Sequence, residues 1–101
     1  MLAPLLNIAA YRFVPLDELP ALRAQLHTSA DALGLKGTVL LAPEGINLVL
    51  AGAPADVQAW LVSLQADVRL AGLPVKRSWS AAPPFRRLKV RIKREDRKSV
   101  V

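Results

Sequence analysis

The sequence contains no cysteine and only one histidine. Without cysteine, the chain can form no disulfide, no thiolate nucleophile and no zinc site that uses cysteine. His27 falls within an expected helix, so a Ser-His-Asp arrangement would have to be built around an exposed helical position. The carboxylates are scattered rather than clustered as metal ligands. We therefore expect no metal, no cofactor and no catalytic residue in this chain.

Long apolar runs are also missing. No uninterrupted hydrophobic segment approaches the ~20 residues of a membrane-spanning helix, and the start, MLAPLLNIAA, lacks the basic residues of a signal peptide. Because 52% of the 101 residues are hydrophobic, the chain has enough apolar surface to fold as one domain. We expect a soluble cytoplasmic domain that makes no membrane contact.

The net charge of +6 is concentrated at the C-terminal end. Up to residue 85 the basic and acidic residues balance. After it, Glu95 and Asp96 are the only acids, and the basic residues are Arg86, Arg87, Lys89, Arg91, Lys93, Arg94, Arg97 and Lys98. We divide the chain into a domain over residues 1–95 and a charged tail over residues 96–101.

Hydrophobic periodicity predicts the order of helices and strands. Strands are expected at 5–14, 38–42, 46–51, 74–80 and 87–93. A first helix should begin with Asp17 as its N-cap and close at Gly34, and a second should begin at Pro54. The apolar stripe of the second helix comprises Val57, Trp60, Leu61, Leu64 and Val68. This order predicts an α+β fold: a ferredoxin-like βαββαβ antiparallel sheet with both helices on one face, plus an extra C-terminal basic strand.

The segment GTVLLAPEGINLVLAG contains a polar interruption between two apolar strands. Pro43, Glu44, Gly45 and Asn47 have a structural interpretation: Pro43 suits the first corner of a turn, and Gly45 the left-handed position that ends a three-residue hairpin loop. The second strand of this hairpin is apolar on both sides, with Ile46, Leu48 and Leu50 on one side and Val49 and Ala51 on the other. We therefore expect the open sheet face to pack against a domain or molecule outside this chain.

The segment RLKVRIK alternates between apolar and basic residues. Same-side residues on a strand are about 6.6 Å apart, which suits successive phosphates along a nucleic-acid strand. The predicted nucleic-acid-binding residues are Arg86, Arg87, Lys89, Arg91, Lys93 and Arg94. Tyr11, Trp79 and Phe85 can stack on bases if they are exposed. The alternative is that these charges only protect a sheet edge from aggregation.

Acyl-phosphate hydrolysis is a weaker alternative. Small enzymes of this activity share the expected topology and hold phosphate in a glycine-rich loop after the first strand, using an arginine, with an asparagine nearby. Arg12 and Asn47 are available for these roles. The segment YRFVPLDE contains no glycine, however, so the phosphate loop is missing.

Three segments resemble the bacterial rhodanese-related, oxygen-dependent tRNA uridine hydroxylases. They are GTVLLAPEGINLVLAG, PPFRRLKVRIKRE and YRFVPLDELPALRAQL. The resemblance implies an acylphosphatase-like N-terminal domain that precedes a rhodanese-like domain with a catalytic cysteine, and a product, 5-hydroxyuridine, at the wobble position of tRNA. Since this chain has no cysteine, the resemblance implies a supporting role: binding tRNA or bracing the catalytic domain. A module that only docks another domain through its open sheet face is the alternative.

Overall fold

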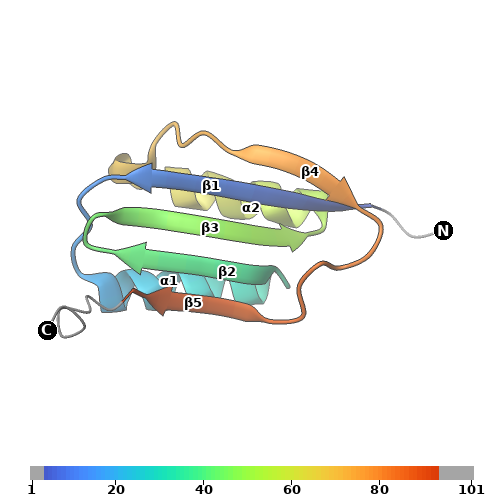
Figure 1. The fold of residues 1–101 in the computed structure, drawn as a ribbon, viewed down its shortest axis with the longest axis horizontal. Helices are drawn as coiled ribbons and strands as arrows, with labels where there is room; N and C mark the ends of the chain where they lie inside the picture. Colours follow the sequence, from blue (N-terminus) through green and yellow to red (C-terminus); the bar gives the residue numbers. More distant parts are fainter. Residues whose placement is uncertain (1–3, 94–101) are drawn as a thin grey trace, which may run out of the picture.

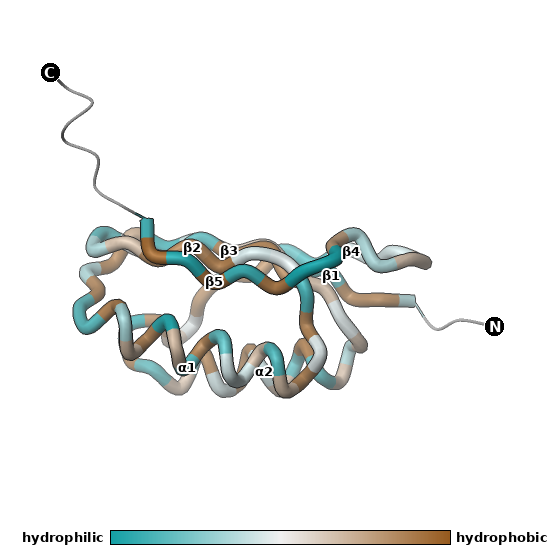
Figure 2. Tube along the Cα trace, turned by 90° about the horizontal axis from the view of Figure 1, so that it is seen from below, coloured by the Kyte–Doolittle hydropathy of each residue, from teal (hydrophilic) through white to brown (hydrophobic). Residues whose placement is uncertain are grey.

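The computed structural model describes residues 4–93, which form a two-layer α+β structure (Figure 1). Arg94 and the expected tail, 96–101, lie outside the described residues. The elements in chain order are β1 (Leu5–Phe13), α1 (Leu19–Ala32), β2 (Lys36–Ala42), β3 (Gly45–Gly52), α2 (Pro54–Gln65), the short 3₁₀ helix η1 (Val68–Leu70), β4 (Lys76–Ser80) and β5 (Leu88–Ile92). Both helices cover one face of the sheet and leave the other open (Figure 2). We call this uncovered side the open face.

The strands are arranged in the order β4-β1-β3-β2-β5. Three pairings, β1 with β3, β1 with β4 and β2 with β3, are antiparallel, whereas β5 runs parallel to β2. The expected ferredoxin-like arrangement of β1 to β4 with both helices on one face is thus confirmed, but the sheet is mixed rather than antiparallel throughout, because β5 is parallel to β2. The reason is visible in Figure 1: the segment after β4 crosses one end of the sheet, so β5 starts at that end and runs opposite to β4.

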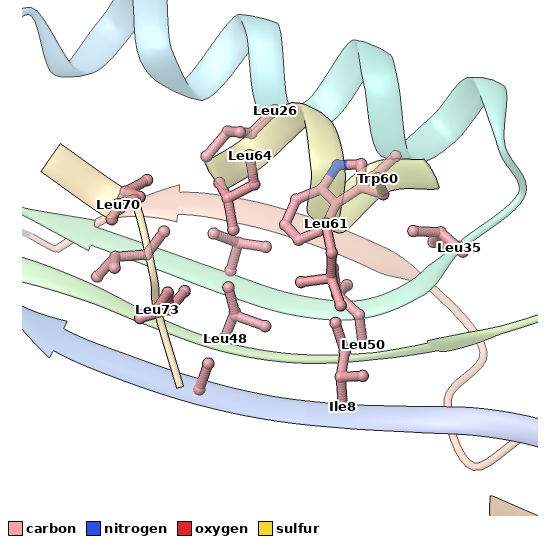
Figure 3. Close-up of a cluster of buried hydrophobic side chains, with 14 of the residues drawn as sticks. Ile8, Leu26, Leu35, Leu48, Leu50, Trp60, Leu61, Leu64, Leu70 and Leu73 are labelled. Carbon is pink, nitrogen blue, oxygen red and sulfur yellow. The ribbon is translucent and has the colours of Figure 1, made fainter. Parts of the chain in front are cut away.

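The core lies between the sheet and the helices. β1 and β3 direct Ile8, Leu48 and Leu50 toward α2, which contributes Trp60 and Leu61, all at most 1% exposed (Figure 3). The indole Nε1 of Trp60 donates a hydrogen bond of 3.0 Å to Ser29 Oγ on α1, which satisfies the one polar atom of that ring. Neither helix of residues 4–93 is long and apolar enough to cross a membrane.

The predicted start of α1 and end of α2 were wrong, because Asp17 and Asp67 interact with Arg69. Asp17 does not cap α1: Glu18 occupies the N-cap position, and the Asp17 carboxylate lies 3.1 Å from Arg69 Nη1. Val68 is not part of the stripe of α2, since it lies in η1 and is 86% exposed. The helix ends before it because the Asp67 carboxylate accepts a hydrogen bond from the Arg69 backbone N–H at 2.9 Å.

The hairpin turn contains two residues rather than the expected three. Ala42 pairs with Gly45, which leaves only Pro43 and Glu44 between β2 and β3. The carbonyl oxygens of these two residues accept hydrogen bonds, each 3.0 Å long, from the backbone N–H groups of Leu16 and Val14. The turn thus holds the connection between β1 and α1 in place.

Candidate nucleic-acid interface

The basic strand β5 buries one side and exposes the other. Val90 is 2% exposed, whereas Lys89 and Arg91 are exposed. In the register of β5 with β2, Lys89 lies directly beside Thr38 and Arg91 directly beside Leu40. We describe residues paired in this way as level with one another. Since the buried Val90 points toward the helices, its neighbours Lys89 and Arg91 lie on the open face.

The cations on either side of β5 continue the same row. Arg87 precedes β5 and Lys93 follows it, and both side chains are exposed. Their backbones are fixed, because the Arg87 carbonyl accepts a 2.8 Å hydrogen bond from the Gly37 N–H and the Lys93 N–H donates one of 2.6 Å to the Leu41 carbonyl. Four predicted residues are therefore brought together as a basic row on the open face: Arg87, Lys89, Arg91 and Lys93. Arg86 is exposed in the preceding connector.

The strands add two further cations to the open face. Lys36 on β2 is level with Ala51, and Lys76 on β4 is level with Ala9, positions that point away from the helices. Sequence reasoning did not single out these lysines, because their face depends on strand register. Within residues 4–93 the acidic residues lie outside the strands, in the helices, turns and connectors: Asp17, Glu18, Asp31, Glu44, Asp56 and Asp67. The open face therefore carries a positive potential.

Two aromatic side chains on β1 also lie on the open face. Tyr11 is 66% exposed and Phe13 is 82% exposed, and their rings pack edge to face with centroids 6.1 Å apart. Sequence reasoning named Tyr11 but missed Phe13. The available signal was spacing, since residues two apart on a strand share a face.

The other two expected stacking residues are not on this face. Trp79 is 59% exposed, but it is level with the buried Leu6 and so lies on the helix side of the sheet edge. Phe85 is half-buried in the connector before β5. Of the three aromatic residues that the sequence suggested, only Tyr11 accompanies the basic row.

A shallow hollow of about 170 Å³ lies between the aromatic pair and the end of the basic row. Its lining includes Tyr11, Phe13, Asn47 and Lys93, together with Glu44 of the turn. Between Phe13 on β1 and the Lys93 end of the basic row lie two small residues, Gly45 on β3 and Ala42 on β2. Small residues at this level of the sheet leave room for a ligand.

The residues proposed for acyl-phosphate hydrolysis are not brought together. The Arg12 guanidinium extends to the helix side, where Nη1 donates hydrogen bonds of 2.8 Å to the Ala71 carbonyl and 3.3 Å to the Arg69 carbonyl. Asn47 is level with Tyr11 on the open face. The two side chains are therefore separated by the sheet. Among residues 4–93, no three metal-ligating side chains cluster either.

The fold is that of an acylphosphatase-like domain. Solved structures with the same fold include an acylphosphatase from Bacillus subtilis, with a TM-score of 0.59 at 11% identity, covering 90% of this chain and 100% of that one. The BLUF structure of BlrP1 gives a TM-score of 0.67 at 23% identity, covering 91% of this chain and 64% of that one. At these identities the similarity concerns the fold alone.

The chain belongs to the UPF0176 acylphosphatase-like domain family, which matches residues 5–95. It is 60% identical over 91 residues to a tRNA uridine(34) hydroxylase of Variovorax paradoxus and 56% identical over 91 residues to one of Bordetella avium. Each match covers 90% of this chain but only 35% and 38% of those relatives. The family resemblance predicted from the sequence is thus confirmed, and the chain corresponds to about a third of the relatives' length.

Proposed function

We propose that this chain is the accessory N-terminal domain of a cytoplasmic tRNA-modifying enzyme, and that its basic row contacts tRNA. The full-length protein would hydroxylate the wobble uridine in a separate rhodanese-like domain, because this chain contains no cysteine. Two findings support the proposal. The relatives are named tRNA uridine(34) hydroxylases, and they are much longer than this chain.

The observation that carries the proposal is the separation of charge between the two layers. The charged residues that the described strands direct toward the open face are all basic: Lys36, Lys76, Lys89 and Arg91. Edge protection alone requires charges on the edge strand, yet Lys36 lies on β2, which is paired on both sides. Cations that extend inward from the sheet edge can neutralise several phosphates of a polyanion. Binding is then favoured by the release of the counterions that those phosphates held.

A pair of matched double variants tests this function. Replacing Lys89 and Arg91 with Ala removes two charges from the open face, while replacing Arg23 and Arg77 removes two exposed charges from the helix side. The first variant should weaken tRNA binding and lower the slope of log Kd against log salt by about 2, because each lost phosphate contact lowers it by about 1. The second should leave this slope nearly unchanged. Fluorescence anisotropy of labelled tRNA at several salt concentrations measures both.

Two results would contradict the proposal. One is an absence of tRNA binding by the unmodified chain at low salt. The other is an equal loss of affinity in the two double variants, which would mean that net charge rather than the open face determines binding.

The competing function is a module that only docks the catalytic domain. It is favoured by the apolar part of the open face, where Val49 is 39% exposed and Leu40 is partly exposed. Adding the remaining part of the full-length protein in trans distinguishes the two. If that part associates with the chain through Val49 while tRNA does not bind, the docking function is correct.

A further inference from the structure

We propose that Tyr11 and Phe13 form a stacking platform for unpaired RNA bases, so that a single-stranded loop of the RNA, rather than a duplex stem, lies across the open face. This inference rests on the proposed function, because it assumes that the basic row binds RNA. It goes further by naming the part of the RNA that the domain recognises, unpaired bases, and the residues that bind them, Tyr11 and Phe13.

The two rings are accessible on a rigid strand. β1 is paired with β3 from Leu6 to Phe13, which fixes the backbone at both rings, whereas β4 pairs only with Leu5–Ala9 and leaves the other side of β1 open beside Tyr11 and Phe13. Tyr11 is 66% and Phe13 is 82% exposed. Tyr11 lines the 170 Å³ hollow on one side and a second hollow of about 580 Å³, with Lys76, on the other. The Tyr11 side chain thus borders open space in two directions, as a ring that stacks on a base requires.

Strand register places phosphate-binding groups at a suitable distance from the rings. Tyr11 is level with Asn47, Asn47 with Leu40, and Leu40 with Arg91. Three strand spacings therefore separate Tyr11 from Arg91, roughly 14 Å between Cα atoms. Both side chains are long enough to extend over the intervening strands. A nucleotide strand lying across the face can place its bases on β1 and its phosphates along β5.

Asn47, which lies between the rings and the basic row, can form hydrogen bonds with the edge of a base. Asn47 is exposed beside Tyr11, and its amide offers two donor hydrogens and an acceptor oxygen. Bases in a duplex cover one another's faces, whereas bases in loops can stack on aromatic side chains and use their edges for hydrogen bonds. Stacking residues next to an amide therefore favour unpaired bases.

The charges around the rings favour RNA over a protein partner. Protein interfaces are depleted in lysine, particularly at their centre. Here every lysine of residues 4–93 lies on the open face: Lys36, Lys76, Lys89 and Lys93. A protein surface covering the aromatic pair would have to bury or pair several of these ammonium groups. An RNA strand would neutralise them.

The test compares two single-stranded RNAs of equal length and charge, one with bases and one made of abasic nucleotides. The unmodified chain should bind the RNA with bases at least about tenfold more tightly, since stacking of even one base on an aromatic side chain changes affinity by roughly that factor. Replacing Tyr11 and Phe13 with Leu keeps apolar bulk on the strand and should abolish this preference without changing the affinity for abasic RNA. Trp79→Leu removes an exposed ring from the helix side and should keep the preference.

A spectroscopic readout complements the affinities. Tyr11 is the only tyrosine, so 3-fluorotyrosine labelling gives one ¹⁹F signal that reports on this ring. The signal should shift on adding RNA with bases and remain nearly unchanged with abasic RNA.

The outcomes separate this inference from the function on which it rests. Equal, salt-dependent binding of both RNAs would overturn the platform and leave the proposed function intact. Binding of neither RNA and of no tRNA would overturn both. Tighter binding of a duplex of equal charge would also overturn the platform. If the remaining part of the full-length protein displaced the RNA and shifted the ¹⁹F signal itself, the face would belong to that domain instead.

Discussion

At the scale of single residues, Gly45 determines how closely β1 and β3 approach beside the aromatic pair. It has a φ of 158° and is level with Phe13, and a Cβ at this position would lie 2.2 Å from the Arg12 carbonyl oxygen. The obstructing atom belongs to backbone, so it cannot move without separating the strands. The residue at position 45 thus controls the geometry of the proposed platform.

Gly45→Ala should therefore lower the free energy of unfolding by about 2–4 kcal/mol, because the clash forces the strands apart. Gly34→Ala is the matched control. Gly34 has a φ of +71° but nothing within 4 Å of an added Cβ, so only the left-handed backbone costs energy, about 1–2 kcal/mol. Urea unfolding measures both variants. Equal destabilisation would show that the close approach to Arg12 is unimportant.

The turn illustrates what local sequence predicts and what it does not. Pro43, Glu44 and Gly45 were recognised as a turn from their residue types, but the loop is two residues long rather than three. The difference is one strand pair, Ala42 with Gly45. Gly45 can join the ladder there because, lacking a side chain, it tolerates the close approach of β1, a contact with a segment more than thirty residues earlier. Phe13 was missed for a similar reason, since its exposure depends on the side of the sheet that the helices leave open.

At the scale of elements, η1 is held by a bidentate ion pair. Arg69 Nη2 donates to Asp67 Oδ2 at 2.7 Å and Nε to Oδ1 at 3.0 Å. Hydrogen bonding to the Arg69 side chain lowers the pKa of Asp67 below its usual value of 3.8. Because the folded pKa is depressed, the unfolded chain binds more protons near and below pH 3.8. The pair's contribution to stability is therefore present above that pH and is lost as the pH falls through the lowered folded-state pKa.

Asp67→Asn should accordingly destabilise the protein at pH 7 by about 0.5–1 kcal/mol, a range that allows for solvent screening of a partly exposed pair. At pH 2 the difference should shrink, since this pH lies below the ordinary pKa of 3.8, where the Asp67 carboxyl group of the unfolded chain is protonated and the contribution of the pair is being lost. Denaturant unfolding at the two pH values measures this, with the exposed Asp31→Asn as control. A difference that is equal at both pH values would contradict the assignment.

Periodicity predicted most elements, and tertiary contacts explain the exceptions. The alternation of RLKVRIK and the four-residue steps of Leu22, Leu26 and Ala30 are local signals, and the structure buries these three residues of α1 and the apolar side of β5. The direction of β5 relative to β2 was not predictable in this way, because it follows from the path of the connector across the sheet. Asp17 was assigned as a cap from its position alone, whereas its partner Arg69 lies 52 residues away.

At the scale of the whole molecule, the two layers have different chemical characters. The helix layer and the connections between elements hold the acidic residues of the described part and the buried aromatic Trp60, while the open face holds the lysines and the exposed Tyr11 and Phe13. The sequence located the basic row because it is one continuous segment. It could not show that Lys36 and Lys76 lie on the same face as that row, since only the strand order brings these separate segments onto one face.

The central claim is that RNA lies on the open face, and valine methyl groups test it most directly. Val49 is exposed on the open face, whereas Val62 on α2 and Val68 in η1 are exposed on the helix side. In a methyl NMR titration of the chain with tRNA, we expect the Val49 signals to shift or broaden while those of Val62 and Val68 stay unchanged. Perturbation of Val62 or Val68 with an unaffected Val49 would contradict the account.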